Sequence, residues 1–250
     1  MAMLFSLVAR AEQLTIAVAS NFAAPMQQIA RQFEQRSGHQ VKLAFGSTGK
    51  IFAQIYHGAP FQAFFSADQA KPAQLVELGL AEASSRFTYA EGKLALWSSK
   101  SKFVDSNGEV LSHGSYNRLA IANPKLAPYG AAAVEVLQQL GLEESTRRRQ
   151  VQGENISQTY QFVASGNADL GLVAVSQLLQ DGSTTKGSVW VVPEHLYSPI
   201  RQDAVILQRG LDSSAMNEFW EFVQSAEARA IIRAYGYRTA QKIDNNINAE

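Results

Sequence analysis

The sequence predicts a two-lobed α/β protein in which each lobe is a mostly parallel sheet flanked by helices, with a ligand cleft between the lobes. The first eighty residues alternate strand and helix patterns, which is typical of a parallel sheet. Two strand-like runs, 87–89 and 93–97, then follow each other with only Glu91-Gly92 as a break, which indicates a crossing into a second lobe. A late strand at 203–207 can cross back.

The first lobe begins with a buried strand at 14–19. The helix after it starts near 22–24, because Pro25 fits only in a first turn. Further strands are predicted at 41–45 and 61–66, each followed by a helix. The chain is expected to divide into residues 12–90 with 203–240 as lobe 1 and 91–202 as lobe 2.

The second lobe starts with a polar loop at 102–114 and continues through a strand at 119–122. A helix starts at Pro128-Tyr129-Gly130 and stops at Gly141. Shorter patterns predict strands near Val151 and over 169–174 and 189–192. Two helices, 213–224 and 225–234, complete the globular part.

The composition is that of an ordinary globular protein: 250 residues, 46% hydrophobic and 18% charged. The 22 basic and 22 acidic residues cancel, so no basic surplus points to nucleic acid or a membrane surface. The absence of cysteine excludes disulfides, Cys-ligated metals and thiol catalysis. An anion ligand would have to be held by local donors and dipoles rather than by bulk charge.

Residues 1–11 are expected to be the remnant of a signal peptide, since a short apolar run precedes the A-x-A pattern Ala9-Arg10-Ala11. This predicts secretion. No other stretch approaches the ~20 apolar residues of a membrane span. The polar residues 241–250 are expected to form a tail.

Four strand-to-helix turns carry small donors or bare backbone. They are Ser20-Asn21, Ser47-Thr48, Pro128-Tyr129-Gly130 and Asn155-Ile156-Ser157. A helix N-terminus offers free N–H groups and a positive dipole end, which suit an anion. Two turns belong to each lobe, so facing lobes would bring all four to one cleft. The alternative for Ser47 or Thr48 is an ordinary N-cap.

A set of short motifs in this order and spacing resembles one known family. The motifs are Ala19-Ser20-Asn21-Phe22, Gly46-Ser47-Thr48-Gly49, Gly58-Ala59-Pro60, Phe65-Ser66-Ala67-Asp68, Arg86-Phe87-Thr88-Tyr89-Ala90, Asn123-Pro124, Ala127-Pro128-Tyr129-Gly130 and Gly166-Asn167-Ala168-Asp169-Leu170-Gly171. The chain resembles the periplasmic molybdate/tungstate-binding proteins, the receptors of ABC importers, from about Leu14 to Gly236. The resemblance implies a type II periplasmic-binding-protein fold, no enzymatic activity and no cofactor.

The resemblance also implies which residues bind the oxyanion. They are Ser20, Asn21, Ser47, Thr48, Tyr129 and Ile156, the last two through backbone N–H groups. Some members add a tyrosine hydroxyl at a position that Ala174 holds here. The sequence leaves open whether Asn21 replaces that donor. The implied partners are molybdate or tungstate and, transiently, an inner-membrane ABC permease. Nucleic acid is not expected, and the protein is expected to be a monomer.

The residues themselves agree with a fully deprotonated dianion. Molybdate needs donors only, whereas a protonated phosphate needs an acceptor, and no matched position is Asp or Glu, although Glu154 lies nearby. Sulfate or another tetrahedral oxyanion remains an alternative ligand. An enzyme or a sensor domain on the same fold is a further alternative, but no nucleophile–base pair and no DNA-binding segment before Leu14 is found.

Other candidate features point to structural roles. Gly46-Ser47-Thr48-Gly49-Lys50 lacks the first glycine and the final hydroxyl of a P-loop. The four histidines have no metal-ligand spacing. Asp68 is expected to cap a helix or line the cleft, and the run Arg147-Arg148-Arg149 is expected to be a solvated helix face. The three tryptophans are expected in the cores or on lobe surfaces.

Overall fold

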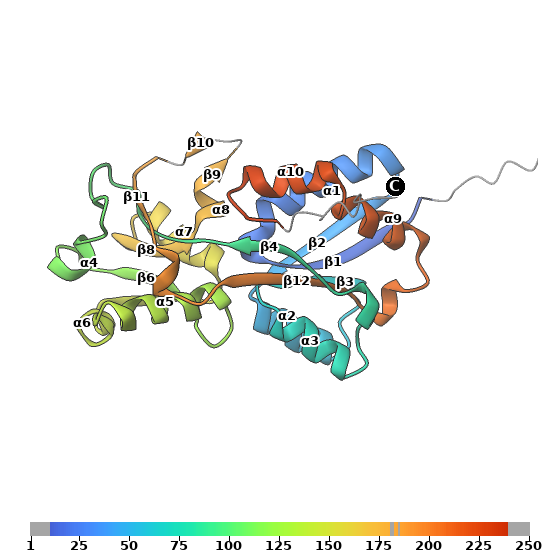
Figure 1. Ribbon diagram of the computed structural model, residues 1–250, viewed down its shortest axis with the longest axis horizontal. Helices are drawn as coiled ribbons and strands as arrows, with labels where there is room; N and C mark the ends of the chain where they lie inside the picture. The colour runs from blue at the N-terminus through green and yellow to red at the C-terminus, as the bar shows by residue number, and fades with distance from the viewer. Residues whose placement is uncertain (1–10, 181–182, 185, 240–250) are drawn as a thin grey trace, which may run out of the picture.

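The computed structural model describes residues 11–180, 183–184 and 186–239. The predicted signal peptide (except Ala11) and the tail 241–250 lie outside these residues. Two five-stranded sheets with helices on both faces form two lobes, arranged side by side along the long axis (Figure 1). The predicted fold class is therefore confirmed. No helix in the described part of the chain has the length and apolar character needed to cross a bilayer.

Lobe 1 contains the sheet β2-β1-β3-β12-β4. Its strands are β1 (Gln13–Ala19), β2 (Gln40–Gly46), β3 (Ala63–Phe65), β4 (Phe87–Gly92) and β12 (Ile200–Ile206). Its helices are α1 (Ala23–Ser37), α2 (Thr48–Tyr56), α3 (Ala70–Glu77), α9 (Ser214–Val223) and α10 (Ala226–Ala234). A short 3-10 turn, η1 (Ser20–Phe22), joins β1 to α1.

Lobe 2 contains the sheet β11-β5-β8-β6-β7. Its strands are β5 (Leu94–Ser98), β6 (Leu119–Ala122), β7 (Gln150–Gly153), β8 (Leu170–Ala174) and β11 (Ser188–Val191), and a small separate pair is formed by β9 (Leu179–Gln180) and β10 (Ser183–Thr184). Its helices are α4 (Val110–His113), α5 (Pro128–Gln139), α6 (Glu143–Arg147), α7 (Ile156–Ala164) and α8 (Val175–Leu178).

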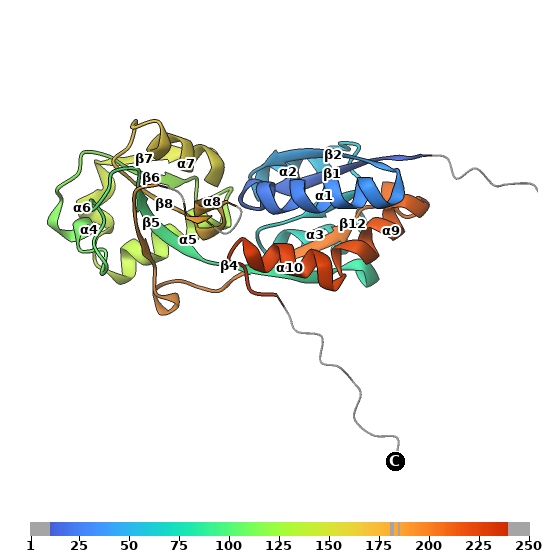
Figure 2. The ribbon, with the colours of Figure 1, turned by 90° about the horizontal axis from the view of Figure 1, so that it is seen from above.

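Each sheet has four strands in one direction and one reversed strand. In lobe 1, β12 is antiparallel to both β3 and β4, while β1 is parallel to β2 and β3. In lobe 2, β5 is antiparallel to both β8 and β11, while β6 is parallel to β7 and β8. The reversed strands are those next to the two crossings between lobes, and Figure 2 shows β4 leading from one lobe toward the other.

The division at 90/91 and 202/203 stays our proposed domain assignment. Strands β4 and β12 span its boundaries, and they pair with each other from Gly92 with Ile200 to Phe87 with Ala204. The register shifts between Gln202 and Asp203. A bulge there turns the strand locally and points two neighbouring side chains to new positions.

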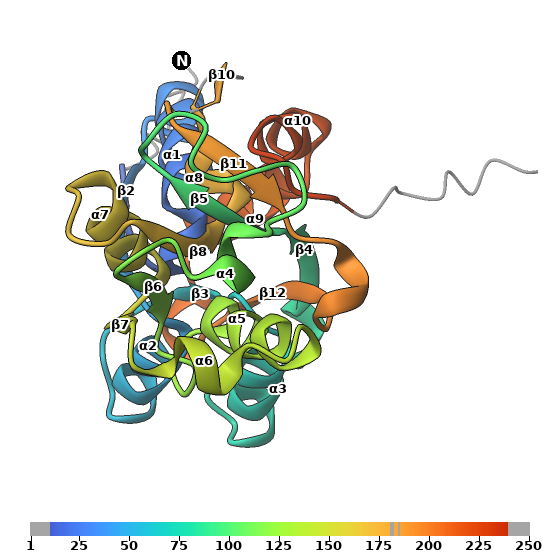
Figure 3. The same ribbon diagram turned by 90° about the vertical axis from the view of Figure 1, so that its left-hand side faces the viewer.

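Alternating side chains of the strands build two cores in each lobe. In lobe 1, Ile16, Val18 and Phe65 face α1, α9 and α10, whereas Ala17 and Phe64 face α2 and α3. This is the period of two that a strand buried on both faces requires. In lobe 2 the corresponding helices are α5 on one face and α7 on the other (Figure 3).

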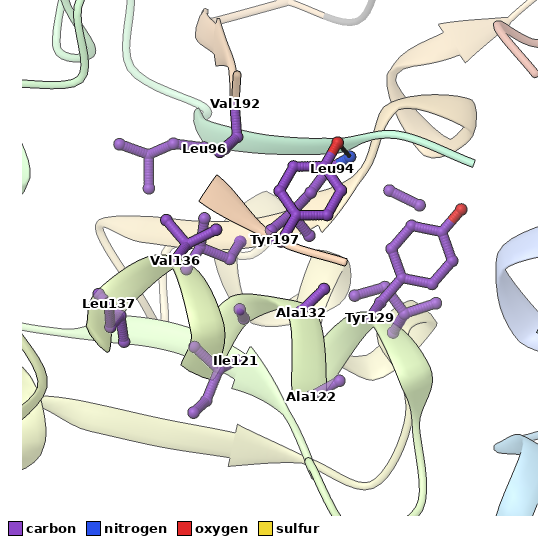
Figure 4. Close-up of a cluster of buried hydrophobic side chains, with 14 of the residues drawn as sticks. Leu94, Leu96, Ile121, Ala122, Tyr129, Ala132, Val136, Leu137, Val192 and Tyr197 are labelled. Carbon is purple, nitrogen blue, oxygen red and sulfur yellow. Dashed lines mark hydrogen bonds between the residues drawn. The ribbon is translucent and has the colours of Figure 1, made fainter. Parts of the chain in front are cut away.

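The larger core of lobe 2 lies between α5 and the sheet. Figure 4 shows Leu94, Leu96 and Ile121 packed against Val136 and Leu137 of α5. The Leu94 N–H donates to the Tyr197 hydroxyl at 3.1 Å. Tyr129 lies at the margin of this cluster, with its hydroxyl directed away from the other labelled side chains. The start of α5 is thereby fixed at the edge of the lobe.

The predicted polar loop 102–114 contains the short helix α4, which the sequence pattern did not indicate. Val110 and Leu111 are buried in the larger core of lobe 2. The Asp105 carboxylate accepts the N–H groups of Glu109 and Val110, both at 3.0 Å. Two apolar residues are too few for a periodic pattern, so only the tertiary contacts reveal this helix.

Candidate anion-binding site

The four predicted turns surround one small cavity between the lobes. Its lining is Ala19, Ser20, Asn21, Gly46, Ser47, Thr48, Ala67, Ala127, Pro128, Tyr129 and Ile156. All six residues expected to bind the oxyanion are among these eleven. The cavity has a volume of about 10 Å³. Such a space suits a compact ion and not an extended organic ligand.

Ser47 has a buried hydroxyl without a partner. Its side chain is 2% exposed, and its Oγ makes no hydrogen bond in the described structure. Ser47 occupies the N-cap position of α2, yet its side chain accepts no N–H group there. Ser47 therefore stands at the N-cap position without making the side-chain hydrogen bond of an ordinary cap. A buried hydroxyl without a partner is costly, so its presence in the cavity wall points to a ligand.

Thr48 uses its hydroxyl oxygen for a contact within the protein and can offer its backbone N–H to the cavity. Its Oγ1 accepts the N–H of Ala67 at 3.0 Å, which fixes the turn after β3 against the start of α2. Thr48 is the first residue of α2, and the first N–H groups of a helix have no partner within the helix. The N–H group of Thr48 is therefore suited to the cavity.

Lobe 2 supplies the starts of two further helices. Pro128 and Tyr129 are the first residues of α5, and Ile156 is the first residue of α7. Asn155 caps α7 by accepting the Gln158 N–H at 3.0 Å. The Tyr129 hydroxyl accepts from Gln202 Nε2 at 3.2 Å, outside the cavity lining. The group that Tyr129 can offer to the cavity is therefore its N–H.

The first loop differs in one respect from the expectation. Asn21 Nδ2 donates to Gln202 Oε1 at 2.8 Å and to the Tyr237 hydroxyl at 2.9 Å. An amide has only two N–H donors, so the Asn21 side chain has none left for the cavity. It therefore does not replace the tyrosine hydroxyl that the resemblance implies at the position of Ala174, and Ala174 itself is buried in β8 outside the cavity lining. The groups of this loop that can still donate to the cavity are the Ser20 hydroxyl and the backbone N–H groups of the turn.

The cavity wall carries no charge, since none of the eleven lining residues is acidic or basic. Glu154, the nearest carboxylate in the sequence to the fourth turn, is paired with Lys50 across the lobes at 2.8 Å. The wall therefore offers donors and helix dipoles but no carboxylate acceptor. Such a wall favours an anion that has no proton to donate.

Asp68 has the structural role that the sequence suggested. Its carboxylate accepts the Lys71 N–H at 2.8 Å and the Ser66 hydroxyl at 3.1 Å, at the start of α3. Burial raises the pKa of Asp68 above its ordinary value, and these hydrogen bonds oppose that shift. Asp68 lines a wider interlobe groove of about 360 Å³ and not the small cavity.

The other candidates also lie away from the cavity. Trp97 stacks on Tyr160, with ring centroids 4.7 Å apart. Trp190 lies in the larger core of lobe 2, and the Trp220 indole N–H donates to the Ser85 carbonyl. Arg147 and Arg148 are exposed, but Arg149 donates to the Gly114 carbonyl and lies over the Tyr116 ring. The described residues contain no group of three or more side chains suited to a metal ion.

Two lobes that enclose a donor-lined, uncharged cavity define a receptor for a small solute. The chain belongs to the family of bacterial extracellular solute-binding proteins, whose model matches residues 14–238. This confirms the family resemblance of the motifs. The protein is a transport component and not an enzyme.

Two curated relatives and one solved structure are similar over nearly the whole chain. The molybdate-binding protein ModA of Azotobacter vinelandii is 51% identical over 234 residues, which are 94% of this chain and 93% of the relative. ModA of Rhodobacter capsulatus is 47% identical over 235 residues, 94% and 91% of the two chains. The structure of the periplasmic molybdate-binding protein of A. vinelandii has a TM-score of 0.89 and 41% identity, and covers 91% of this chain and 100% of its own.

Proposed function

We propose that this protein binds molybdate in the interlobe cavity and delivers it to an ABC-type permease of the inner membrane. The observation that carries the proposal is the buried, unpartnered Ser47 hydroxyl in a wall that has donors and no charge. The ligand-binding residues in this proposal are Ser20, Asn21, Ser47, Thr48, Tyr129 and Ile156. Asn21 acts here through its backbone N–H, because Gln202 and Tyr237 accept both N–H groups of its side-chain amide. The names of the similar ModA proteins support molybdate as the ligand.

The chemistry of the wall separates molybdate from phosphate. Molybdate is a dianion without a proton at neutral pH, so it can accept hydrogen bonds at every oxygen. Phosphate near neutral pH keeps a proton that needs an acceptor, and the lining residues provide no carboxylate. Hydrogen bonds to a charged group contribute about 1.5–3 kcal/mol each. Several of these, less the desolvation and closure costs, give micromolar to nanomolar affinity.

Tungstate has the same charge and shape as molybdate, so the proposal extends to both ions. Sulfate is also a dianion and would satisfy the same donors, and only the length of its bonds distinguishes it. We propose that the receptor works in the periplasm as a monomer and contacts its permease transiently. A protein that must release its ligand to a membrane partner needs such a reversible, hydrogen-bonded site.

The test is a calorimetric titration of the anion-free protein with molybdate, tungstate, sulfate and phosphate. We expect tight one-to-one binding of molybdate and tungstate, with weak binding of sulfate and none of phosphate. A preference for sulfate would keep the receptor class and replace the ligand. Absence of heat with all four anions would contradict an oxyanion site in this cavity.

A further inference from the structure

A layer of buried polar side chains adjoins the anion cavity. We call it the polar network, and it consists of Asn21, Tyr89, Tyr129, Ser176, Gln202 and Tyr237. Each of these residues is at most 4% exposed. Only Asn21 and Tyr129 also line the cavity. The network comes from η1, β4, α5, α8, β12 and the segment that follows α10, so it joins parts of the chain that are distant in sequence.

Tyr237 contacts both the backbone carbonyl and the side-chain amide of Asn21. Its hydroxyl lies 2.8 Å from the Asn21 carbonyl oxygen and accepts from Asn21 Nδ2 at 2.9 Å. Its ring packs edge-on against Phe22, the next residue of the turn, with ring centroids 5.4 Å apart. These contacts fix the peptide planes of the Ser20–Phe22 turn, which forms part of the cavity wall.

The same hydroxyl reaches lobe 2. It lies 2.9 Å from Ser176 Oγ, which belongs to α8, and Ser176 in turn donates to the Asn21 carbonyl at 2.9 Å. Gln202 makes a parallel link, because it accepts from Asn21 Nδ2 and donates to the Tyr129 hydroxyl. These hydrogen bonds tie α8 and α5 of lobe 2 to Tyr237 and to strand β12 of the lobe 1 sheet. They can form only while the two lobes lie as close together as they do in this structure.

We propose that Tyr237 is a positioning residue of the anion site, which orients the Ser20–Phe22 turn and ties that turn to α8 when the lobes are together. This inference rests on the proposed function. Loss of the hydroxyl would leave Asn21 and Ser176 without a shared partner and would free the turn to rotate its N–H groups away from the cavity. Because the Ser176 contact joins the two lobes, its loss shortens the lifetime of the closed complex.

The test compares Tyr237→Phe with Tyr89→Phe. Tyr89 is an equally buried tyrosine of the network. Among the described residues its hydroxyl bonds only to the Ser66 carbonyl, after β3, and to Gln202 Oε1 in β12, and both of these strands belong to the lobe 1 sheet. Calorimetry measures the molybdate affinity, and stopped-flow fluorescence measures the association and dissociation rate constants. Thermal unfolding measures the stability of each variant. We expect Tyr237→Phe to weaken molybdate binding about tenfold, mostly through faster dissociation. Tyr89→Phe is expected to lower the melting temperature similarly while the affinity stays within about twofold.

Ser176→Ala provides a second variant if Tyr237→Phe folds poorly, because it removes the partner of Tyr237 in lobe 2 and leaves the tyrosine in place. We expect it to accelerate dissociation several-fold with little change in association. Unchanged dissociation in Tyr237→Phe and Ser176→Ala, or an equal loss of affinity in Tyr89→Phe, would overturn the positioning role. Failure of the unmodified protein to bind any oxyanion would overturn the proposed function itself, which is a separate result.

Discussion

Ser47 has a hydroxyl that the rest of the described protein leaves available to a ligand. Its buried hydroxyl lacks a hydrogen-bond partner, although it stands at the start of a helix where a serine usually caps the backbone. The same hydroxyl can donate to an oxyanion that fills the cavity. The residue is therefore better explained by binding than by folding.

We expect Ser47→Ala to weaken molybdate binding by about 1–3 kcal/mol, because one hydrogen bond to a charged ligand is lost. The free protein should be no less stable, since no hydrogen bond within the protein is removed. Calorimetry and thermal unfolding of the variant measure both effects. Ser98→Ala is the control: Ser98 is fully buried in β5, and its Oγ accepts the Lys100 N–H. Reduced stability of Ser47→Ala with unchanged affinity would contradict this assignment.

The buried tyrosines of the polar network predict a response to alkaline pH. Burial raises the pKa of Tyr237 from its ordinary 10.0 to about 12, and burial also raises the pKa values of Tyr89 and Tyr129 well above 10.0. The neutral forms are thus favoured by folding. Their contribution to stability is complete below pH 10, where the unfolded tyrosine is neutral, and is lost as pH rises from 10 toward 12.

Denaturant unfolding between pH 7 and 11 measures this effect. We expect the tyrosine contribution to the free energy of unfolding to stay constant up to about pH 9 and to fall above pH 10. The fall should be smaller in Tyr237→Phe. Molybdate affinity should be level from about pH 6 to 9, because no lining residue titrates in that range. A steep change of affinity within that range would point to an ionisable group in the site.

At the scale of elements, the first residues of α2, α5 and α7 form much of the cavity wall. The start of α2 also touches lobe 2 directly, where the Gly49 N–H donates to the Leu126 carbonyl at 2.9 Å. A Cβ on Gly49 would lie 3.1 Å from the Leu126 Cα. Only glycine permits this approach of the two backbones without displacement.

We therefore expect Gly49→Ala to weaken molybdate binding about tenfold, because overpacking of this order costs about 1–3 kcal/mol in the closed arrangement. Each lobe by itself should be little affected, so the ligand-free protein should unfold at nearly the unmodified temperature. Calorimetry and thermal unfolding test this, with Gln54→Ala on the exposed side of α2 as the control. Wild-type affinity in Gly49→Ala would show that this contact is dispensable for closure.

The sequence predicted most elements because their signals are local. Pro25 and Gly38 mark the ends of α1, and Pro128 marks the start of α5. Strand β12 begins at Ile200, three residues before the predicted start. The added residues pair with β4, and this pairing is a long-range contact that a local pattern does not contain. Helix α4 was missed for the same reason, since it depends on Asp105 and the core.

At the scale of the whole molecule, the ligand would bridge two lobes that also touch each other through side chains around the cavity. Among these contacts are the Lys50–Glu154 ion pair at 2.8 Å and the hydrogen bond from Ser157 Oγ to the Ser20 carbonyl at 3.1 Å. An exposed ion pair contributes little by itself. A ligand that binds both walls would add further hydrogen bonds to those of the polar network that join the lobes.

Molybdate at one hundred times its dissociation constant should stabilise the folded protein by about 2.7 kcal/mol. For a chain of this size, we expect the melting temperature to rise by about 5–10 °C. Thermal unfolding with and without molybdate measures the shift, and equal concentrations of phosphate provide the control. An equal shift with phosphate would contradict the selectivity of the donor-only wall.

The meeting of the six candidate residues around one cavity could be predicted because they follow the ends of strands, where the sheet itself brings them together. The polar network could not be predicted, since it depends on contacts between very distant residues. Asn21 and Gln202 are 181 residues apart, and Asn21 and Tyr237 are 216 apart. Neither Gln202 nor Tyr237 stands in a motif, and only the folded chain shows that they adjoin the cavity.

The insertion of β12 between β3 and β4 determines when each lobe can be completed during synthesis. The strands of the lobe 2 sheet all lie between Leu94 and Val191, so a nascent chain that has reached residue 199 already contains that whole sheet. Lobe 1 at that moment has a gap in the middle of its sheet and lacks α9 and α10. A chain that emerges from its N-terminus onward therefore has all strands of its second lobe before its first lobe can be completed by β12.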